Sequence, residues 1–328
     1  MVKVVRVHQP GPAEAMQIEN LEVGIPGEGE ALVKIEAIGL NRAEIGFRQG
    51  GYIAPPAWPA RIGYEASGVV EATGPGVEGF TAGQRVSILP NFRQGQWGVY
   101  AEQAIVPASS LIAMPDWMDF QHGAAVWMQY FTAMAVIEVG DAGVGDFVIV
   151  PAASSSVGLS AIQLANWAGA ETIAATRTSA KAEALRKLGA RHVIATEEVD
   201  VPAEVMRITG GKGARIVFDP VGGPMVNTWA NAMAERGILF QYGGLSGQPT
   251  PYPHWQAAMK GLSVRGWIAT EIWGKPERYA KYKDLILHGL QTGHLKPVIS
   301  KTFKLDQIVE AHRYMEANEQ IGKVVVLP

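Results

Sequence analysis

Three consecutive serines lie where their hydroxyl groups could bind phosphate. Residues 148–170 read VIVPAASSSVGLSAIQLANWAGA. The apolar start is typical of a buried strand, and the residues after the serines have the spacing of an amphipathic helix closed by Gly169. Residues 152–158 therefore form the predicted tight turn, where a pyrophosphate would meet the positive end of a helix. The alternative is that the serines only cap the helix.

The small residues of this turn depart from the usual glycine pattern of nucleotide-binding turns. In G-x-G-x-x-G the first glycine makes the bend, the second admits phosphate to the backbone, and the third packs the helix on the strand. Gly158 keeps the third role, while Ala153 and Ser155 take the first two places. Their β-carbons make a left-handed bend or a very close approach costly. Ser155 or Ser156 could donate a hydrogen bond to phosphate while the other caps the helix.

Basic and hydroxyl side chains follow the next predicted strand. Thr176, Arg177, Thr178, Ser179 and Lys181 stand where a carboxylate would select NAD by bonding the ribose 2′-hydroxyl. Arg177 and Lys181 offer charge-assisted donors to a 2′-phosphate instead. The segment therefore favours NADP(H) over NAD(H). The alternative is a solvated loop in which Ser179 caps the following helix.

Composition limits the class of protein. The chain has 328 residues, 48% of them hydrophobic and 18% charged, which is enough for two packed cores. A net charge of −3 gives no electrostatic reason to expect nucleic acid or an anionic membrane as partner. The absence of cysteine excludes disulfides, thiolate metal sites and a thiol nucleophile. We expect a cytoplasmic protein that binds neither nucleic acid nor membrane.

The pattern of elements changes along the chain. Residues 1–122 are rich in glycine, proline and short β-branched runs, which predicts a β-rich domain. Over residues 123–266, apolar strands alternate with helical segments, which is typical of a parallel sheet with helices on both faces. Residues 267–328 hold two predicted helices and a final strand, GKVVVLP. The sequence thus predicts an α/β fold.

Six stretches together form a specific combination. They are GLNRAEIGFRQGGY (39–52), GYEASGVVEATGPGVEGFTAGQRV (63–86), GVYAE (98–102), PAASSSVGLSAIQLA (151–165), VFDPVGG (217–223) and GKVVVLP (322–328). In them the chain resembles the medium-chain dehydrogenase/reductase superfamily, and in particular its zinc-independent quinone oxidoreductase and enoyl reductase branch. The resemblance implies a GroES-like β-rich catalytic domain from residues 1–122 and 267–328. It also implies a Rossmann, doubly wound parallel-sheet domain from 123–266 that binds NADP(H), and a homodimer.

The resemblance also bears on the metal. Zinc-dependent relatives carry a cysteine and a histidine ligand at positions where this chain has Asn41 and Tyr64. Asparagine and tyrosine are poor ligands for zinc, so we predict no metal site. The residues predicted to bind NADP(H) are Ala152, Ser155, Ser156, Val157, Gly158, Thr176, Arg177, Lys181, Val221, Gly243, Gly244 and Lys323.

Without a metal, hydride addition to a quinone or a conjugated alkene is easier than reduction of an isolated carbonyl. The charge spreads to a distant oxygen that one or two hydrogen-bond donors can stabilise. The resemblance suggests Asn41 and Tyr52 as these catalytic donors. The alternatives are that Asn41 closes a turn and that Tyr52 is a packed aromatic.

The sequence therefore predicts an NADPH-dependent reductase of quinones or α,β-unsaturated carbonyl compounds, acting on a small, apolar, planar substrate. Three other functions stay open. Two are enzymatic: an NADP-dependent alcohol dehydrogenase or carbonyl reductase, and an enoyl-thioester reductase. The third is a crystallin-like protein that binds nucleotide without turnover.

Overall fold

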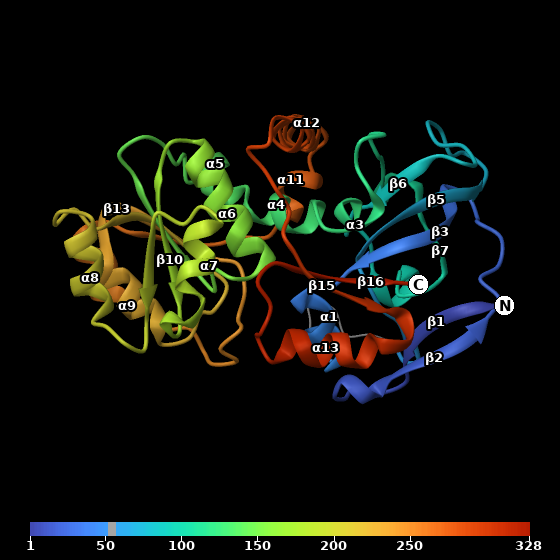
Figure 1. The fold of residues 1–328 in the computed structure, drawn as a ribbon, viewed down its shortest axis with the longest axis horizontal. Coiled ribbons are helices and arrows are strands. Elements are labelled where there is room, and N and C mark those ends of the chain that lie inside the picture. Colours follow the sequence, from blue (N-terminus) through green and yellow to red (C-terminus); the bar gives the residue numbers. More distant parts are fainter. Residues whose placement is uncertain (52–56) are drawn as a thin grey trace. The chain divides into compact units, whose positions relative to one another are not determined.

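The computed structural model describes residues 1–51 and 57–328. The chain forms two compact units (Figure 1). The terminal unit combines Met1–Met128 with Pro297–Pro328, and the middle unit is Gln129–Lys296. The chain thus leaves the terminal unit once and returns to it for its last two strands.

The terminal unit is built on two antiparallel-rich sheets. The larger has the order β15-β16-β3-β5-β6-β8, with β7 also pairing with β3, and the smaller has the order β2-β1-β4. The strands are β1 (Val2–Val7), β2 (Met16–Leu21), β3 (Glu30–Gly39), β4 (Ala60–Arg61), β5 (Glu65–Thr73), β6 (Arg85–Ile88), β7 (Gln103–Pro107), β8 (Leu111–Ala113), β15 (Ile299–Lys304) and β16 (Lys323–Leu327). The helices are α1 (Arg42–Arg48), α2 (Gln94–Trp97), α3 (Phe120–Gly123) and α13 (Ile308–Glu316).

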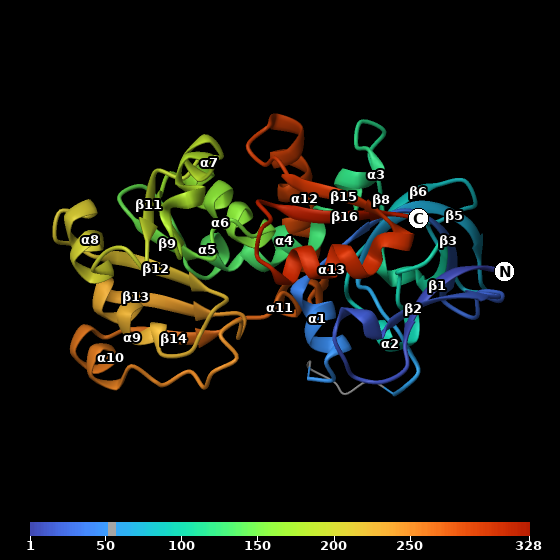
Figure 2. The ribbon, with the colours of Figure 1, turned by 60° about the horizontal axis from the view of Figure 1, so that its bottom comes forward.

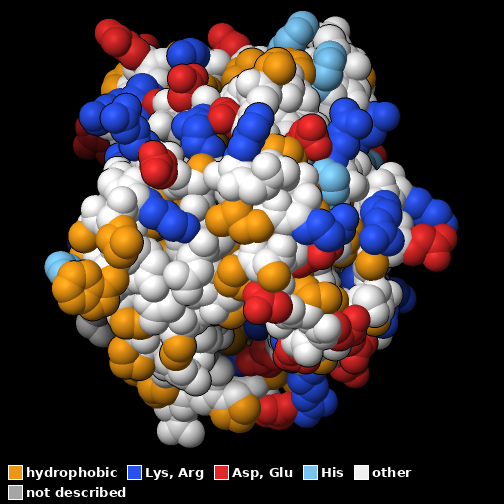
Figure 3. Space-filling view, turned by 90° about the vertical axis from the view of Figure 1, so that its left-hand side faces the viewer, with side chains coloured by type: hydrophobic (Ala, Val, Ile, Leu, Met, Phe, Trp, Pro, Cys, Tyr) orange, Lys and Arg blue, Asp and Glu red, His pale blue; other side chains and the backbone are white. Residues whose placement is uncertain are grey.

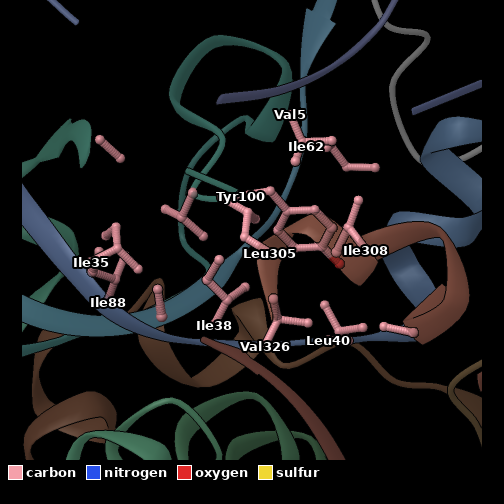
Figure 4. Packing of buried hydrophobic residues seen from close by; sticks show 14 of the residues in the cluster. Val5, Ile35, Ile38, Leu40, Ile62, Ile88, Tyr100, Leu305, Ile308 and Val326 are labelled. Carbon is pink, nitrogen blue, oxygen red and sulfur yellow. The ribbon is translucent and has the colours of Figure 1, made fainter. Parts of the chain in front are cut away.

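One apolar core joins the sheets of the terminal unit to its helices. Alternate residues of β3 are buried, as a strand with one face on a core requires. Figure 4 shows Ile38, Val326 and Ile308 around the ring of Tyr100, all of them almost fully buried. Each such aliphatic side chain stabilises the fold by about 1.5–3 kcal/mol relative to exposure. In Figure 1 and Figure 2, α13 lies beside β16, so the end of the chain completes this core.

The middle unit is a Rossmann fold. Its sheet is all parallel, in the order β11-β10-β9-β12-β13-β14. The strands are β9 (Phe147–Pro151), β10 (Glu171–Thr176), β11 (His192–Ala195), β12 (Ala214–Asp219), β13 (Met233–Gln241) and β14 (Ser263–Gly266). The helices are α4 (Trp127–Ala133), which starts in the terminal unit, α5 (Ala135–Glu138), α6 (Ser156–Trp167), α7 (Ala182–Lys187), α8 (Val201–Ile208), α9 (Met225–Ala232), α10 (His254–Lys260), α11 (Thr270–Trp273) and α12 (Pro276–Thr292). The predicted α/β fold class is confirmed.

Residues 267–296 lie in the middle unit, although the predicted catalytic domain included them. Aromatic packing explains the difference. Trp273 meets the ring of Phe131 edge to face, and Tyr279 stacks on it, each at 5.9 Å between ring centroids. The indole of Trp267 also donates a hydrogen bond of 2.7 Å to the carbonyl of Thr132. Helices α11 and α12 are therefore anchored to α4 within this unit.

The surface mixes side-chain types. Figure 3 shows a face on which basic and acidic side chains alternate, with hydrophobic side chains gathered mainly in its lower half. Among the residues that the structure describes, every helix falls short of the length and apolar content needed to cross a bilayer.

Candidate functional site

Four loops meet at the carboxyl edge of the middle sheet. Strands β9, β10, β12 and β13 are parallel and adjacent, so the loops that follow them emerge on one side. The chain reverses its direction across the sheet between β9 and β12, which makes this edge a topological switch point. Doubly wound folds bind nucleotides at such a point. Eleven of the twelve predicted cofactor residues lie in these loops or in the helix and strand ends next to them, and Lys323 lies in the terminal unit.

The serine turn bends at Ala152. This residue has a left-handed φ of 48°, whereas the sequence spacing assigned the bend to Ala153. The prediction was one residue late because Ala153 is fully buried and its N–H continues the sheet, donating to the carbonyl of Ala175 at 3.3 Å. Alanine accepts the left-handed conformation at a cost that glycine would avoid.

Ser155 is the residue that caps α6. Its Oγ accepts the N–H of Gly158 at 3.0 Å, and its hydroxyl hydrogen is still able to donate to an anion. The N–H groups of Ser156 and Val157 lie in the first helical turn, which has no acceptor within the helix. A β-carbon on Gly158 would come within 2.9 Å of Ala153, so only glycine lets α6 pack this closely. The turn therefore offers donors suited to a pyrophosphate.

The loop after β10 carries the predicted 2′-phosphate donors. Arg177 is exposed, and Lys181 donates to the hydroxyl of Ser154 at 3.2 Å, which links this loop to the serine turn. Thr176 bonds the carbonyl of Thr178. One carboxylate near this loop was not predicted: that of Glu198, which follows β11 and accepts the N–H of Ser179 at 2.9 Å. Because Glu198 is far along the chain, only the register of β10 with β11 reveals it.

The loops after β12 and β13 are tied to each other. Buried Asp219 accepts the N–H groups of Val221 at 2.7 Å and Gly222 at 3.2 Å, and burial raises the pKa of this carboxyl. The N–H of Ser246 donates to the carbonyl of Val221 at 2.9 Å. A β-carbon on Gly243 would lie 2.7 Å from the carbonyl oxygen of Pro220. The predicted residues Val221, Gly243 and Gly244 therefore belong to one fixed pair of turns.

A buried polar cluster lies in the terminal unit around Asn41, at the start of α1. The ammonium Nζ of Lys323 is 2.6 Å from Oδ1 of Asn41 and 2.6 Å from Oε2 of Glu65. The side chains of Lys323 and Glu65 are both 0% exposed. Lys323 thus has protein partners in place of the predicted cofactor contact, because the charge of a fully buried lysine requires a buried counter-charge.

Glu44 adds a second carboxylate to this cluster. It is fully buried and accepts the backbone N–H of Asn41 at 2.6 Å, the reach-back contact of a helix capping box. Its other oxygen accepts the amide of Asn41 at 3.3 Å and the N–H of Tyr64 at 3.2 Å. Burial raises the pKa of Glu44 to about 7, although the charge of Lys323 opposes the shift. The N-x-x-E spacing in NRAE is the sequence signal that could have found it.

A second buried titratable group, His312, was also not predicted. His312 of α13 is fully buried, and its Nε2 lies 3.1 Å from the hydroxyl of Tyr100. Burial, reinforced by the nearby charge of Arg48, lowers the pKa of His312 to about 3. Arg48 is itself fully buried and pairs with Glu316. The signal in the sequence is weak, because a histidine within an amphipathic helix is usually solvated.

Of the two predicted catalytic donors, Tyr52 lies outside the described residues. Asn41 is 9% exposed, and its amide nitrogen faces the carbonyl of Gly39 at 3.2 Å and two carboxylates. Tyr64 is half-buried, and its ring centroid lies 6.1 Å from that of Phe92. Both polar atoms of the Asn41 side chain, Oδ1 and Nδ2, therefore make hydrogen bonds within the buried cluster.

The positions that correspond to zinc ligands do not suit zinc. A cation bound at Asn41 would stand beside the Lys323 ammonium, which lies 2.6 Å from Oδ1 of Asn41 and 2.6 Å from Oε2 of Glu65. Two positive charges at such a distance repel strongly in a buried site. Within residues 1–51 and 57–328, no group of three or more histidine or acidic side chains is arranged to hold a metal ion.

Comparison with known proteins identifies the family. The model of the alcohol dehydrogenase GroES-like domain matches residues 27–116, and that of the zinc-binding dehydrogenases matches 156–287. A 2-haloacrylate reductase of a Burkholderia species is 31% identical, over 100% of this chain and 99% of that protein. A Pseudomonas aeruginosa quinone oxidoreductase is 29% identical over the full length of both.

Solved structures agree with these sequence matches. The Escherichia coli quinone oxidoreductase complexed with NADPH superposes with a TM-score of 0.92 at 26% identity, covering 99% of this chain and 100% of that one. A structure of 2-haloacrylate reductase gives a TM-score of 0.85 at 29% identity, covering 100% of this chain and 99% of that one. The chain belongs to the medium-chain dehydrogenase/reductase superfamily, in its zinc-independent quinone oxidoreductase branch.

Proposed function

We propose that this protein is an NADPH-dependent oxidoreductase that reduces quinones or the C=C bond of α,β-unsaturated carbonyl compounds without a catalytic metal. The observation that carries the proposal is the carboxyl edge of the middle sheet, where the serine turn capped by Ser155 and the exposed Arg177 carry donor groups suited to phosphate. Full-length similarity to proteins named quinone oxidoreductase and 2-haloacrylate reductase supports the reaction class. The expected substrate is small, apolar and planar.

The residues of the middle unit fit the cofactor. Ser155 and the N–H groups of Ser156 and Val157 would hold the pyrophosphate, and Arg177 with Lys181 would hold the 2′-phosphate. The bound cofactor supplies a hydride. Residues of the terminal unit would stabilise the oxygen on which negative charge then grows. We propose that residues 1–122, with the end of the chain, form the catalytic domain.

We expect Arg177→Ala to weaken NADPH binding about tenfold or more and to leave NADH binding little changed, because one charge-assisted bond to the 2′-phosphate is lost. Titration of each cofactor by fluorescence measures both affinities. Arg186→Ala removes another exposed arginine of the same unit and is the matched control. An equal loss for both cofactors would show that Arg177 acts through folding or through the adenine.

We expect Tyr52→Phe to lower the turnover of enones about a hundredfold while the affinity for NADPH stays constant, because one oxyanion-type donor is removed and the ring is kept. Quinones should lose less, since their reduced oxygen is the better-stabilised anion. Single-turnover rates with both substrate classes measure this, with Tyr314→Phe as control, because Tyr314 belongs to the same unit and its hydroxyl bonds that of Ser300 at 3.1 Å. Wild-type enone reduction in Tyr52→Phe would remove Tyr52 from the mechanism.

A screen of NADPH consumption against simple quinones and enones tests the proposed function. Turnover of either class supports it. Binding of NADPH without turnover of any substrate would favour the crystallin-like alternative. Reversible oxidation of an alcohol would indicate a carbonyl reductase, and a preference for a thioester over its free acid would indicate an enoyl-thioester reductase.

We also propose a homodimer formed at the β14 edge of the middle unit. Strand β14 ends the sheet, and Tyr252, Trp255 and Met259 in or beside α10 are 63–83% exposed. Exposed apolar clusters next to a free strand edge favour association. We expect Trp255→Glu to halve the mass measured by light scattering, whereas Trp117→Glu, a control in the terminal unit, keeps it. A monomeric wild-type protein would contradict the dimer.

A further inference from the structure

The family model that matches residues 156–287 is described as a zinc-binding dehydrogenase, and the donor set of this chain does not suit that metal. The position next to Asn41, where zinc-dependent relatives have a metal ligand, is nevertheless filled by a cation. Lys323 reaches it from the last strand, β16, and puts one positive charge between Asn41 and Glu65. We propose that Lys323 is a tethered cation that replaces the metal in organising this part of the terminal unit, and that it is a positioning residue for the reduction. The second part rests on the proposed function.

The backbone is shaped to admit this lysine. A β-carbon on Gly39 would lie 2.8 Å from Cε of Lys323 and 1.9 Å from the carbonyl oxygen of Ala124. Only glycine at position 39 therefore leaves space for the lysine stem. Gly39 of β3 pairs with Glu65 of β5 on one side and with Val325 of β16 on the other. Gly39 and the two charged residues, Glu65 and Lys323, therefore belong to three neighbouring strands. The ammonium is held by the fold itself and cannot exchange with solvent cations.

The ammonium also fixes the orientation of the Asn41 amide. Oδ1 accepts from Lys323, while the amide nitrogen faces Gly39, Glu44 and Glu65 at 3.2–3.4 Å. A flipped amide would place its NH₂ group against the ammonium and its oxygen against two carboxylates. Lys323 therefore permits one orientation only.

Glu65 links the Lys323 ammonium to the start of α4. Its Oε2 pairs with Lys323, and its Oε1 accepts the N–H of Met128 at 2.9 Å, in the first turn of that helix. An ionised carboxylate at a helix start is stabilising, and Lys323 compensates the cost of burying it. One ammonium thus organises α1, β5 and the beginning of α4, as a metal ion shared by several segments would do.

Three variants distinguish an effect of the Lys323 charge on kcat from its effect on stability. Lys323→Met removes the charge and leaves Glu65 buried without its partner, so both thermal midpoint and kcat should fall, kcat by about tenfold or more because Asn41 loses its fixed orientation. Lys323→Met combined with Glu65→Gln removes both charges and should recover the midpoint but not kcat. Lys34→Met breaks the exposed pair of Lys34 with Glu36 and should change neither.

Chemical rescue separates this inference from the proposed function. Ethylammonium should raise the thermal midpoint of Lys323→Ala, whereas tetramethylammonium, which has no N–H donor, should not. This readout needs no substrate, so it holds even if every quinone and enone fails. Wild-type kcat in the folded single or double variant, recovery of kcat together with the midpoint in the double variant, or stoichiometric zinc in the wild-type protein after dialysis against Zn²⁺ would each overturn the proposal.

Discussion

Acid should destabilise the terminal unit by about 5 kcal/mol through His312 alone. The pKa of His312 falls from 6.5 to about 3 on folding, and each pKa unit corresponds to about 1.4 kcal/mol. The sign follows from proton binding. Between these two pKa values the unfolded chain binds a proton that the buried imidazole does not. The stability contributed by neutral His312 is therefore full above pH 6.5 and is lost as the pH falls through 3.

Urea unfolding of the wild-type protein and of His312→Gln at a series of pH values measures this effect. The variant should be the less stable protein at pH 7, since Tyr100 loses its partner, and the difference should shrink steadily toward pH 4. His254→Gln removes an exposed histidine and controls for the loss of a histidine as such. A difference between wild type and His312→Gln that stays constant with pH would mean that folding leaves the pKa of His312 unchanged.

Glu44 should act in the opposite direction. Its pKa rises from 4.5 to about 7 on folding, so the folded protein binds a proton that the unfolded chain has released. The stability from protonated Glu44 is present below pH 4.5 and is lost as the pH rises through 7, by about 3 kcal/mol in all. With Glu44 protonated, Lys323 and Glu65 are left as a balanced pair of charges.

Glu44→Gln isolates this effect, because a glutamine of equal size stays neutral at every pH. The variant should gain stability relative to the wild-type protein as the pH rises from 4.5 to 8. Glu36→Gln, in a partly exposed ion pair of the same unit, should show a far weaker trend. Parallel stability curves for the wild-type protein and Glu44→Gln would mean that folding does not raise the pKa of Glu44.

Local patterns were enough to predict the strand, turn and helix at which we propose that the cofactor binds. The apolar run of β9 and the spacing up to Gly158 depend on neighbours in the chain, so the sequence reveals them directly. The bend was misplaced by one residue, because burial of Ala153 is decided by strand β10 and not by the turn. Strand β14 was not predicted, since its four residues carry no apolar alternation.

The polar cluster could not be predicted as a cluster. Lys323 and Glu65 are separated by 258 positions, and either residue alone reads as a charge at the end of a strand. Their pairing depends on the register of β3 with β5 and with β16, which fixes both neighbours of Gly39. Tertiary packing also decides the place of α11 and α12, whose aromatic side chains match Phe131 of α4.

The return of the chain to the terminal unit has a consequence for the order of folding. The contact between Glu65 and Lys323 closes a loop that contains the whole middle unit. For a flexible loop, the entropic cost of closure grows by about 0.6 kcal/mol with each doubling of length. Once the middle unit has folded, its residues no longer count as flexible chain within this loop. The flexible chain between β5 and β16 is then much shorter, and the entropic cost of pairing β16 with β3 is lower. Substitutions that slow folding of the middle unit should therefore delay assembly of the charged cluster, although every residue of that cluster belongs to the other unit.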